Sequence, residues 1–589
     1  MPRLALNIGI TGHRASILPP GMIDKIQPLV DEVFHELRNA ALKIHAEEGD
    51  IFTPVEPILR LHTPLATGAD QVAAISARTN GFFIRALLPF APDEYRRDFT
   101  EGAERDEFNH QLAMADALFA LPGERDEEQE AYVIVGKAVI AAADILVAIW
   151  DGKEGNGRGG TAHVVDLALG GSVPIIHIAI DREHGLVERP RLLIGGDAVE
   201  PIGKPLTASE DYAALLRDTL VPHTTVEREQ IADFLHEREK RTNLRIEYPL
   251  LLSLLRVKKW TRAAWLQSSI EQDIAWEYKN IAEQDASGCW RDIAEAYGWA
   301  NFLAIRYAQL FRSGHVTNYF LSALAVMLAL IGLLAPHLKI FLVVAELATI
   351  GLLFLNTNAG TDGEWHRRWL QYRHLAESLR PLIYLKRSGL ISTPFRSDFI
   401  GGPTHREAGA DWTRWYAAAV WREMESPTGV ITHNEVRQLV KDVMTEQIVP
   451  QAQYHEVNSE RMEKLDHRLH EIGNFLMGAV IAACVLFLLG YFPLHEYVKK
   501  LTYPFIVLTA GLPAVGAAVF GMRGHGEHLL AASRSANTAL ALERNAARLK
   551  HIFRNDLLAA ELEKTATIML ADLNEWTVSY RERALEIPA

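Results

Sequence analysis

The chain is poor in cysteine and carries no excess of basic residues. It has 589 residues but two cysteines, Cys289 and Cys484, which stand too far apart in sequence to form a motif. Neither a disulfide framework nor a zinc site is therefore expected, and a reducing compartment is the simpler assumption. The 74 acidic residues outnumber the 60 basic ones, which gives a net charge of −14. This balance gives no reason to expect a nucleic-acid partner.

The N-terminal sequence also lacks the features of a signal peptide. In MPRLALNIGITGHR, a short apolar run ends at a glycine turn, as a strand does. Hydrophobic residues make up 49% of the chain, a share between those of a soluble enzyme and a polytopic transporter. The length leaves room for several domains of about 100 to 200 residues each. These numbers fit a chain that is part soluble and part membrane-bound.

Four long apolar segments are the most informative feature of the sequence. A helix needs about 20 mostly apolar residues to cross roughly 30 Å of hydrocarbon. Apolar segments form two closely spaced pairs, 316–335 with the shorter 340–355 and 472–492 with 504–522. The alternative is that they are buried core helices of a large soluble protein. Two pairs, each joined by a polar turn, favour two membrane hairpins.

Basic residues next to the four segments predict their orientation. Arginines and lysines lie next to the ends of the segments that are away from the turns. The turns hold Lys339 and the Lys499–Lys500 pair. The positive-inside rule then places both termini in the cytoplasm and both turns outside. We therefore expect a multi-pass protein of a plasma membrane.

Residues 1–185 alternate short apolar strands with amphipathic helices. Strict alternation of this kind predicts an α/β fold, a Rossmann-like parallel sheet with flanking helices, followed here by an all-α region with the four apolar helices. Ligands of such sheets bind beyond the carboxyl ends of the strands. We expect strands at 4–11, 59–65, 83–90, 117–121, 144–150 and 174–180.

Beyond this domain, 186–245 is expected to connect it to two helical units. The units cover 246–410 and 411–589, and each contains one hairpin. A charged helix follows each hairpin, WHRRWLQYRHLAESLR at 365–380 and HLLAASRSANTALALERNAARLKHI at 528–552. The two helices share alanine, glutamate and arginine at similar spacings, which indicates an internal duplication.

Three loops at the carboxyl ends of predicted strands have the composition of a ligand site. Their glycines let a ligand approach the backbone, and a glycine-rich loop that leads into a helix suits a phosphate. Arg14 suits a phosphate or carboxylate, while Asp70 either accepts ribose hydroxyls or caps its helix. Because the loops share one edge of the sheet, we expect a single nucleotide site. Its candidate residues are Gly12, His13, Arg14, Thr67, Gly68, Ala69, Asp70, Asp151, Gly152, Gly157, Gly159, Gly160 and Thr161.

Two carboxylates outside these loops are further candidates. Glu94, just after the third strand, is placed to reach a ligand base or ribose, although the helix dipole alone also favours a carboxylate at a helix start. Glu346 is the one carboxylate within the four apolar segments. Such groups often mark an ion path, so Glu346 is a pore candidate. A protonated, hydrogen-bonded glutamate is the equal alternative.

Several stretches of the N-terminal third, GITGHR, ATGADQVAA, LLPFAPDEY and ADILVAIWDG with GRGGTA, resemble the SLOG superfamily. These are Rossmann-like domains similar to the DNA-processing protein DprA and the cytokinin-activating LOG enzymes. The helical half, and WHRRWLQYRHLAESLR most of all, resembles SLATT domains, which are two-transmembrane effectors and look doubled here. In bacterial anti-phage systems, SLOG domains are thought to sense nucleotide-derived signals and SLATT domains are predicted to perforate the membrane.

The resemblance implies a ligand-gated channel or membrane-disrupting effector of an anti-phage defence system, in the inner membrane of a prokaryote. Its ligand would be nucleotide-derived, of the ADP-ribose or NAD type, with no metal implied and a partner enzyme as its source. Four spans are few for a wide pore, so a homo-oligomer in the lipid bilayer is expected.

The alternative is a membrane-tethered nucleotide hydrolase or a LOG-type phosphoribohydrolase. LOG enzymes carry a PGGxGTxxE loop, whose glutamate supports cleavage of an N-glycosidic bond. Here the loop continues as TAHVV from Thr161, and Asp166 comes one step later. A pocket that lacks the catalytic acid favours sensing over turnover.

Overall fold

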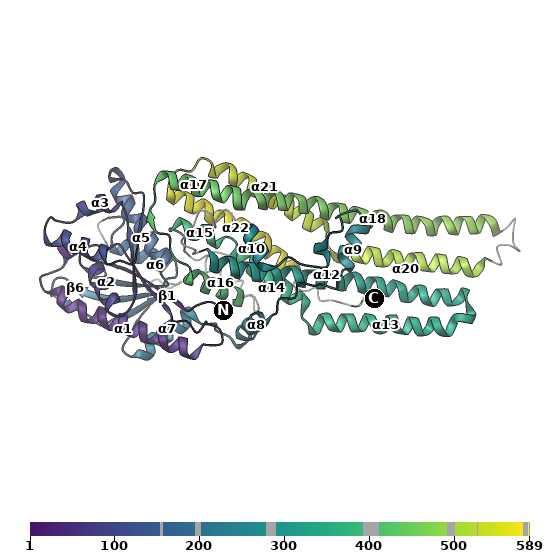
Figure 1. Ribbon diagram of the computed structural model, residues 1–589, viewed down its shortest axis with the longest axis horizontal. Helices are drawn as coiled ribbons and strands as arrows, with labels where there is room; N and C mark the ends of the chain where they lie inside the picture. Colours follow the sequence, from purple (N-terminus) through teal and green to yellow (C-terminus); the bar gives the residue numbers. More distant parts are fainter. Residues whose placement is uncertain are drawn as a thin grey trace.

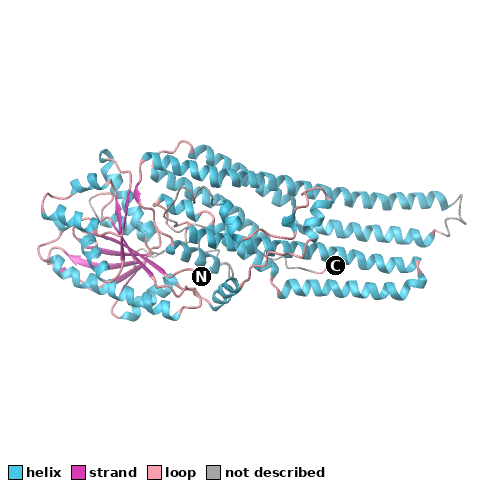
Figure 2. Ribbon diagram, viewed as in Figure 1, coloured by secondary structure: helices cyan, strands magenta, loops and turns pink. Residues whose placement is uncertain are grey.

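The protein is elongated, with all strands at one end and four long helices projecting at the other (Figure 1, Figure 2). Cys289, residue 492 of the third predicted span and the predicted boundary at 410 lie outside the residues described below. The computed structural model describes residues 1–153, 157–194, 202–277, 290–392, 411–491, 501–526, 528–580 and 587.

The N-terminal domain is built on a ten-stranded sheet, which confirms the predicted α/β fold. The strand order is β10-β4-β3-β2-β1-β5-β6-β8-β9, and β7 pairs with β6. Strands β1 to β6 and β10 are parallel, whereas β7, β8 and β9 are antiparallel additions. The bounds are β1 Ala5–Gly12, β2 Ile58–Thr63, β3 Phe83–Leu88, β4 Ala117–Ala120, β5 Ile145–Trp150, β6 Ile175–Asp181, β7 Leu186–Val187, β8 Arg191–Ile194, β9 Ile202–Pro205 and β10 Gly429–Val430.

Helices cover both faces of this sheet, so the central strands read as nearly continuous apolar runs. Helices α1 and α2 pack on one face around Phe34 and Leu61. Helices α5 and α6 pack on the other around Val139, Leu146 and Val164. The bounds are α1 Met22–Glu47, α2 Ala69–Thr79, α3 Pro92–Tyr95, α4 Ala103–Ala113, α5 Glu128–Ala142 and α6 Thr161–Gly170.

The segment expected to connect the domains belongs largely to the sheet domain. Strands β8 and β9 extend the edge of the sheet, and α7 (Ser209–Leu220) packs against α1. Helix α8 (Thr225–His236) follows, and its Phe234 is fully buried. These strands are short and lie at a sheet edge, where the alternation of apolar residues is weak.

Two helical hairpins follow, and in each a very long helix runs outward to the far tip before a shorter one returns (Figure 1). With 44 residues at 1.5 Å each, α12 is roughly 66 Å long, about twice the hydrocarbon thickness of a bilayer. The inner half of such a helix therefore lies outside any membrane. The bounds are α9 Glu247–Leu254, α10 Ile270–Glu277, α12 Arg291–Leu334, α13 Lys339–Asp362, α14 Trp365–Leu379, α15 Leu382–Ser388, α16 Asp411–Glu423, α17 His433–Val443, α18 Val449–Tyr491, α20 Thr502–Gly526, α21 His528–Leu549 and α22 Asn555–Tyr580.

Helices α12, α13, α18 and α20 contain apolar stretches long enough to span a membrane. Between 6% and 22% of each stretch is buried inside the protein. Ile340, Phe341 and Phe475 expose 79%, 73% and 75% of their surface. Core helices of a soluble protein would be buried, and such large exposed apolar surfaces mark a membrane or protein contact. The exposure therefore favours the membrane interpretation over the soluble alternative.

Helix α13 continues beyond Leu355, the predicted end of the second span. Its next residues are polar but bond within the hairpin: Asn356 Nδ2 donates to Asn318 Oδ1 at 2.7 Å and to Gly314 O at 3.0 Å. Asn318 Nδ2 in turn donates to Thr357 Oγ1 at 3.0 Å. These bonds satisfy the polar groups and allow the helix to extend to Asp362.

One hydrophobic core extends from the sheet into the helical half. It joins Ile8 of β1 to Tyr372 and Leu375 of α14 and to Leu562 of α22. Strand β10, which precedes α17, also adds to the edge of the sheet beside β4. The two halves of the molecule are thus packed together rather than joined by a linker.

Candidate functional site

The predicted site lies where the strand order reverses. The chain proceeds outward from β1 in one direction to β2, β3 and β4, and in the other to β5 and β6. The loops after β1 and β5 consequently diverge, which leaves a crevice at the carboxyl ends of the strands. Two of the three predicted loops, those that begin at Gly12 and Asp151, follow these two strands.

The first and second loops are in direct backbone contact. Ala69 N donates to His13 O, and Ala15 N donates to Thr67 O, both at 3.2 Å. A Cβ on Gly68 would lie 2.6 Å from both His13 O and Ala15 N, and the φ of this residue is +92°. A Cβ on Gly12 would lie 2.3 Å from Ala69 Cβ. Both glycines are therefore required for the loops to meet.

Asp151 ties the first loop to the third. His13 Nε2 lies 3.1 Å from Asp151 Oδ1, and Arg182 Nε donates to Asp151 Oδ2 at 2.7 Å. Although burial alone would raise the pKa of Asp151, the bonds from Lys153 N, His13 and Arg182 lower it below the usual range. An ionised Asp151 therefore holds the two switch-point loops together.

Asp70 is a buried carboxyl group at the start of α2. Its side chain accepts a bond from Ala66 N at 3.3 Å. Burial raises the pKa of Asp70 to about 7, against the opposing effects of the Ala66 N–H and of Arg14. The group is thus poised to change charge near neutral pH, at a helix N-terminus where an anion would also bind.

Arg14 reaches into a polar cluster that lies beside the crevice. Its guanidinium carbon lies 5.3 Å from the centre of the Tyr132 ring. The Tyr132 hydroxyl donates to Asp98, and Arg125 Nη1 donates to the same carboxylate at 2.6 Å. The cluster fixes the aromatic face on which Arg14 rests.

Glu94 belongs to this cluster and is already paired. Arg125 Nε donates to Glu94 Oε1 at 2.8 Å, and Arg97 Nη1 donates to the same atom at 2.9 Å. The neighbouring Tyr95 is 1% exposed and packs against Phe99 and Phe108. Any ligand contact of Glu94 would have to share the carboxylate with two arginines.

The third loop leads into α6 through Gly157, Gly159 and Gly160. Gly159 has φ +87°, and a Cβ on it would lie 3.0 Å from Tyr132 Cβ. Its N–H donates to His163 Nδ1 at 2.9 Å, so His163 holds the loop. Helix α6 begins at Thr161 after Gly160, and no side chain caps it. Gly152 and Gly160 are exposed.

The structure thus brings together most of the predicted residues and adds several that the sequence did not indicate. Gly12 to Arg14, Thr67 to Asp70 and Asp151 are in mutual contact, and Tyr132 links the third loop to Arg14. The added residues lie on helices or after β6, where nothing in the local sequence marks them. They are Asp98, Arg125, Tyr132 and Arg182.

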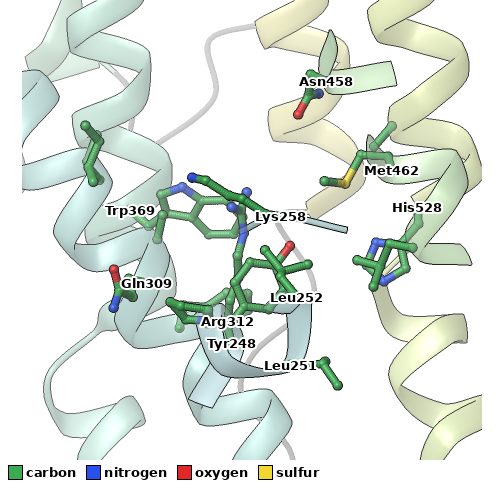
Figure 3. A pocket seen from close by; sticks show the side chains of 18 of the residues that line it. Tyr248, Leu251, Leu252, Lys258, Gln309, Arg312, Trp369, Asn458, Met462 and His528 are labelled. Atoms are coloured by element: carbon green, nitrogen blue, oxygen red, sulfur yellow. The ribbon is translucent and has the colours of Figure 1, made fainter. Parts of the chain in front are cut away.

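Two cavities lie elsewhere among the described residues. One, of about 270 Å³, lies beyond β3 and β4, between Gly123 and Asn555. The other, of about 580 Å³, lies among the helices (Figure 3). Among the described residues, no group of three or more His, Cys, Asp or Glu side chains is arranged to hold a metal ion.

The strands of the crevice also contact the helical half at their other ends. Asp144, just before β5, accepts a bond from Arg422 Nε of α16 at 2.9 Å. Arg60 of β2, which is 1% exposed, donates to Arg422 O at 2.9 Å and to Glu423 O at 3.0 Å. Strand β5 therefore has Asp151 at one end and a helical contact at the other.

Glu346 lies on the outer part of α13 and is half-buried. Within the described residues it forms no hydrogen bond or ion pair. The alternative, a hydrogen-bonded glutamate, therefore has no partner in the part of the chain that the structure describes, and a role in an ion path stays a prediction.

Comparison of the chain with protein-family models, with curated proteins and with solved structures found no match.

Proposed function

We propose that the protein is a membrane effector gated by a nucleotide-derived signal. The observation that carries this proposal is the meeting of three glycine-rich loops beside the switch point of a sheet whose hydrophobic core continues into the helical half, and that half carries four exposed apolar helices. The resemblance to SLOG and SLATT domains supports a role in bacterial anti-phage defence. It also supports a place in the inner membrane, with both termini in the cytoplasm.

In this proposal the anionic part of an ADP-ribose- or NAD-like ligand binds the N-termini of α2 and α6. Arg14 and the exposed backbone at Gly160 would contact it, and Asp151 would keep the loops in place. Ligand binding would stabilise one arrangement of β1 and β5, and Asp144 would pass that arrangement to Arg422. To shift the ratio of the two conformations from 1:99 to 99:1, the ligand must bind one of them more tightly by about 5.5 kcal/mol. In a homo-oligomer, the binding free energies of several sites would add to this shift.

The test is ion flux from liposomes that contain the purified protein, with and without ADP-ribose, NAD and AMP. Gly160→Trp should abolish the response while leaving membrane insertion intact. A Cβ at Gly160 meets only Gly157 O at 3.7 Å, so a larger side chain fills the site and not the core. Gly170→Trp, at the other end of α6 where a Cβ meets nothing within 4 Å, is the control. An unchanged response in Gly160→Trp would remove the site from the proposal.

Asp70 supplies a pH dependence for the same response. Its pKa of about 7 lies above the ordinary value of 3.8, so the folded protein loses stability from this group as pH rises from 3.8 to 7. Ionised Asp70 would also repel a ligand phosphate, and ligand affinity should fall as pH rises from 6 to 8. Asp70→Asn should remove this fall. Titration calorimetry at the two pH values measures it, and an equal fall in both proteins would contradict the assignment.

A further inference from the structure

A cavity lies between the two helical units, at the inner ends of the four apolar stretches. Its volume is about 580 Å³. Side chains of α9, α12, α14, α18, α20 and α21 line it (Figure 3). On α12 its lining reaches Val316, where the first predicted span begins, and on α20 it reaches Met522, where the fourth ends. The cavity thus opens at the level where a membrane surface would lie.

The charges of the lining are unbalanced. Lys258, Lys259, Arg312, Arg373 and Arg534 line it, against Asp273 and Glu377. Glu377 is committed to other partners, since it pairs with Arg373 at 2.6 Å and with Arg380 at 3.1 Å. Within the described residues, neither Lys258 nor Arg312 has a carboxylate within 4.0 Å. Two unpaired cations therefore face one cavity.

Arg312 is held in place by aromatic rings rather than by an acid. Its guanidinium carbon lies 5.0 Å from the centre of the Trp369 ring and 5.5 Å from that of Tyr248. Figure 3 shows Lys258 beside Arg312 and Trp369, with Met462 and His528 on the opposite wall. Burial, together with Arg461 and Arg312, lowers the pKa of Lys258. These positive charges repel one another, and a bound anion would reduce the repulsion.

Below these cations the wall is apolar. Leu252 of α9 packs with Leu465 and Leu469 of α18 in one buried cluster, and Met522 lies against it. Helix α9 exposes Leu250 and Leu254 to 44% and 72%, as a helix lying on a membrane surface does. The cavity therefore places cationic side chains next to an apolar wall.

We propose that this cavity binds the phosphate headgroup of an anionic phospholipid, with Lys258 and Arg312 as its contacts and the acyl chains against Leu252 and Met522. Basic pockets between membrane helices on the cytoplasmic side recognise such headgroups. The proposal rests on the membrane placement proposed above but not on the nucleotide site. A bound lipid would bridge α9 and α12 of the first unit to α18 and α20 of the second.

Native mass spectrometry of the detergent-solubilised full chain tests this proposal. Phosphatidylglycerol should bind with saturation and phosphatidylcholine should not. Lys258→Gln and Arg312→Gln should each weaken phosphatidylglycerol binding about fivefold, since each cation near an anionic headgroup contributes on the order of 1 kcal/mol. Lys464→Gln is the matched control, because Lys464 is exposed on α18 and does not line the cavity.

Three results would overturn the proposal. They are equal binding of the two lipids, unchanged binding in both variants, or displacement of phosphatidylglycerol by inorganic phosphate. The last result would assign the cavity to a soluble phosphate ligand. Lys258 lies in the loop that follows α9 and not in a helix, so its variant reports binding even if Arg312→Gln disturbs folding. Loss of lipid binding with an intact nucleotide response would separate this site from the proposed function.

Discussion

The two helical units share one architecture but differ in what surrounds the helix that leaves each hairpin. Helix α14, after the first hairpin, is buried around its whole circumference from Trp369 to Leu379. Helix α21, after the second, buries a single stripe that includes Ala532, Leu542 and Leu549. The sequences of the two helices are similar in charge, so position in the fold, and not composition, makes one central and the other peripheral.

The charged side chains of α14 correspondingly form ion pairs with other parts of the protein. Arg368 Nη1 donates to Glu237 Oε1 at 2.5 Å, and Arg367 Nη2 donates to Asp233 Oδ2 at 3.2 Å. Asp233 lies in α8 and Glu237 directly follows this helix, at the end of the sheet domain. In α21, by contrast, Arg548 pairs with Glu561 within its own unit. The first unit is thus tied to the sheet domain through its exit helix, whereas the second unit is tied to it through α16, where Arg422 pairs with Asp144.

The largest expected effect comes from removing the buried carboxylate of α14. Glu377→Gln removes the negative charge that Arg373 and Arg380 share, and breaking a buried pair costs about 3 to 5 kcal/mol. The matched change Glu561→Gln removes a half-exposed pair and should cost about 1 kcal/mol or less. Thermal unfolding in detergent, followed by tryptophan fluorescence, compares the two. Equal losses would mean that the two exit helices are equivalent after all.

The same carboxylate predicts an acid dependence. Burial alone would raise the pKa of Glu377, but Arg373 and Arg380 hold it at about 2, below the ordinary 4.5. The stability it contributes is therefore fully present above pH 4.5 and is lost as pH falls toward 2. Glu377→Gln should flatten that part of the stability profile. If the variant loses stability at acid pH as steeply as the wild type, Glu377 is not the source of this pH dependence.

The hairpins meet through a glycine in the second unit. A Cβ on Gly521 of α20 would lie 2.3 Å from Tyr319 of α12, and that tyrosine is 6% exposed and cannot swing aside. Gly521→Ala should therefore destabilise the contact by about 1 to 3 kcal/mol. Gly524→Ala is the control, because a Cβ there meets nothing within 4 Å. It should be neutral or stabilising by up to about 1 kcal/mol. If both variants behave alike, the hairpins do not pack at Gly521.

Hydropathy predicted the spans and the alternation of strands and helices predicted the sheet, because both patterns can be read from the local sequence. The pattern could not reveal β10, since two residues, Gly429 and Val430, carry no periodicity. It also could not distinguish α14 from α21. Their environments are set by packing against α8, α12 and α16, which lie far away in sequence.

The residues of the candidate site likewise divide into those that the sequence could predict and those that it could not. The glycines at 12, 68 and 159 were predictable because close backbone contact leaves a compositional mark. Tyr132 and Arg182 were not, since each reaches the site from an element whose local sequence is unremarkable. Asp70 was ambiguous between capping and binding, and only its burial shows that its charge is sensitive to pH.

The smallest expected effect concerns the polar bonds inside the first hairpin. Asn356 bonds to Asn318 on α12, and its Oδ1 accepts from Arg245 Nη1 at 2.8 Å, which ties the hairpin to the segment before α9. In the second hairpin, Thr509 Oγ1 bonds to Phe505 O of its own helix. Interhelical bonds in membranes contribute about 0.6 kcal/mol each on average. Asn356→Leu should therefore lower stability by about 1 kcal/mol, and Thr509→Val should leave it nearly unchanged.

The same thermal measurement, with a reading of ligand-dependent flux, sharpens the contrast between the hairpins. If the polar bonds fix the first hairpin to the sheet domain, Asn356→Leu should weaken the response to ligand more than its small stability loss explains. A flux response as strong as that of the wild type would show that Arg245 and Asn356 stabilise the hairpin without transmitting the signal. In that event the ion pairs of Asp233 and Glu237 with α14 are the next contacts to test as a route from the sheet domain to the first unit.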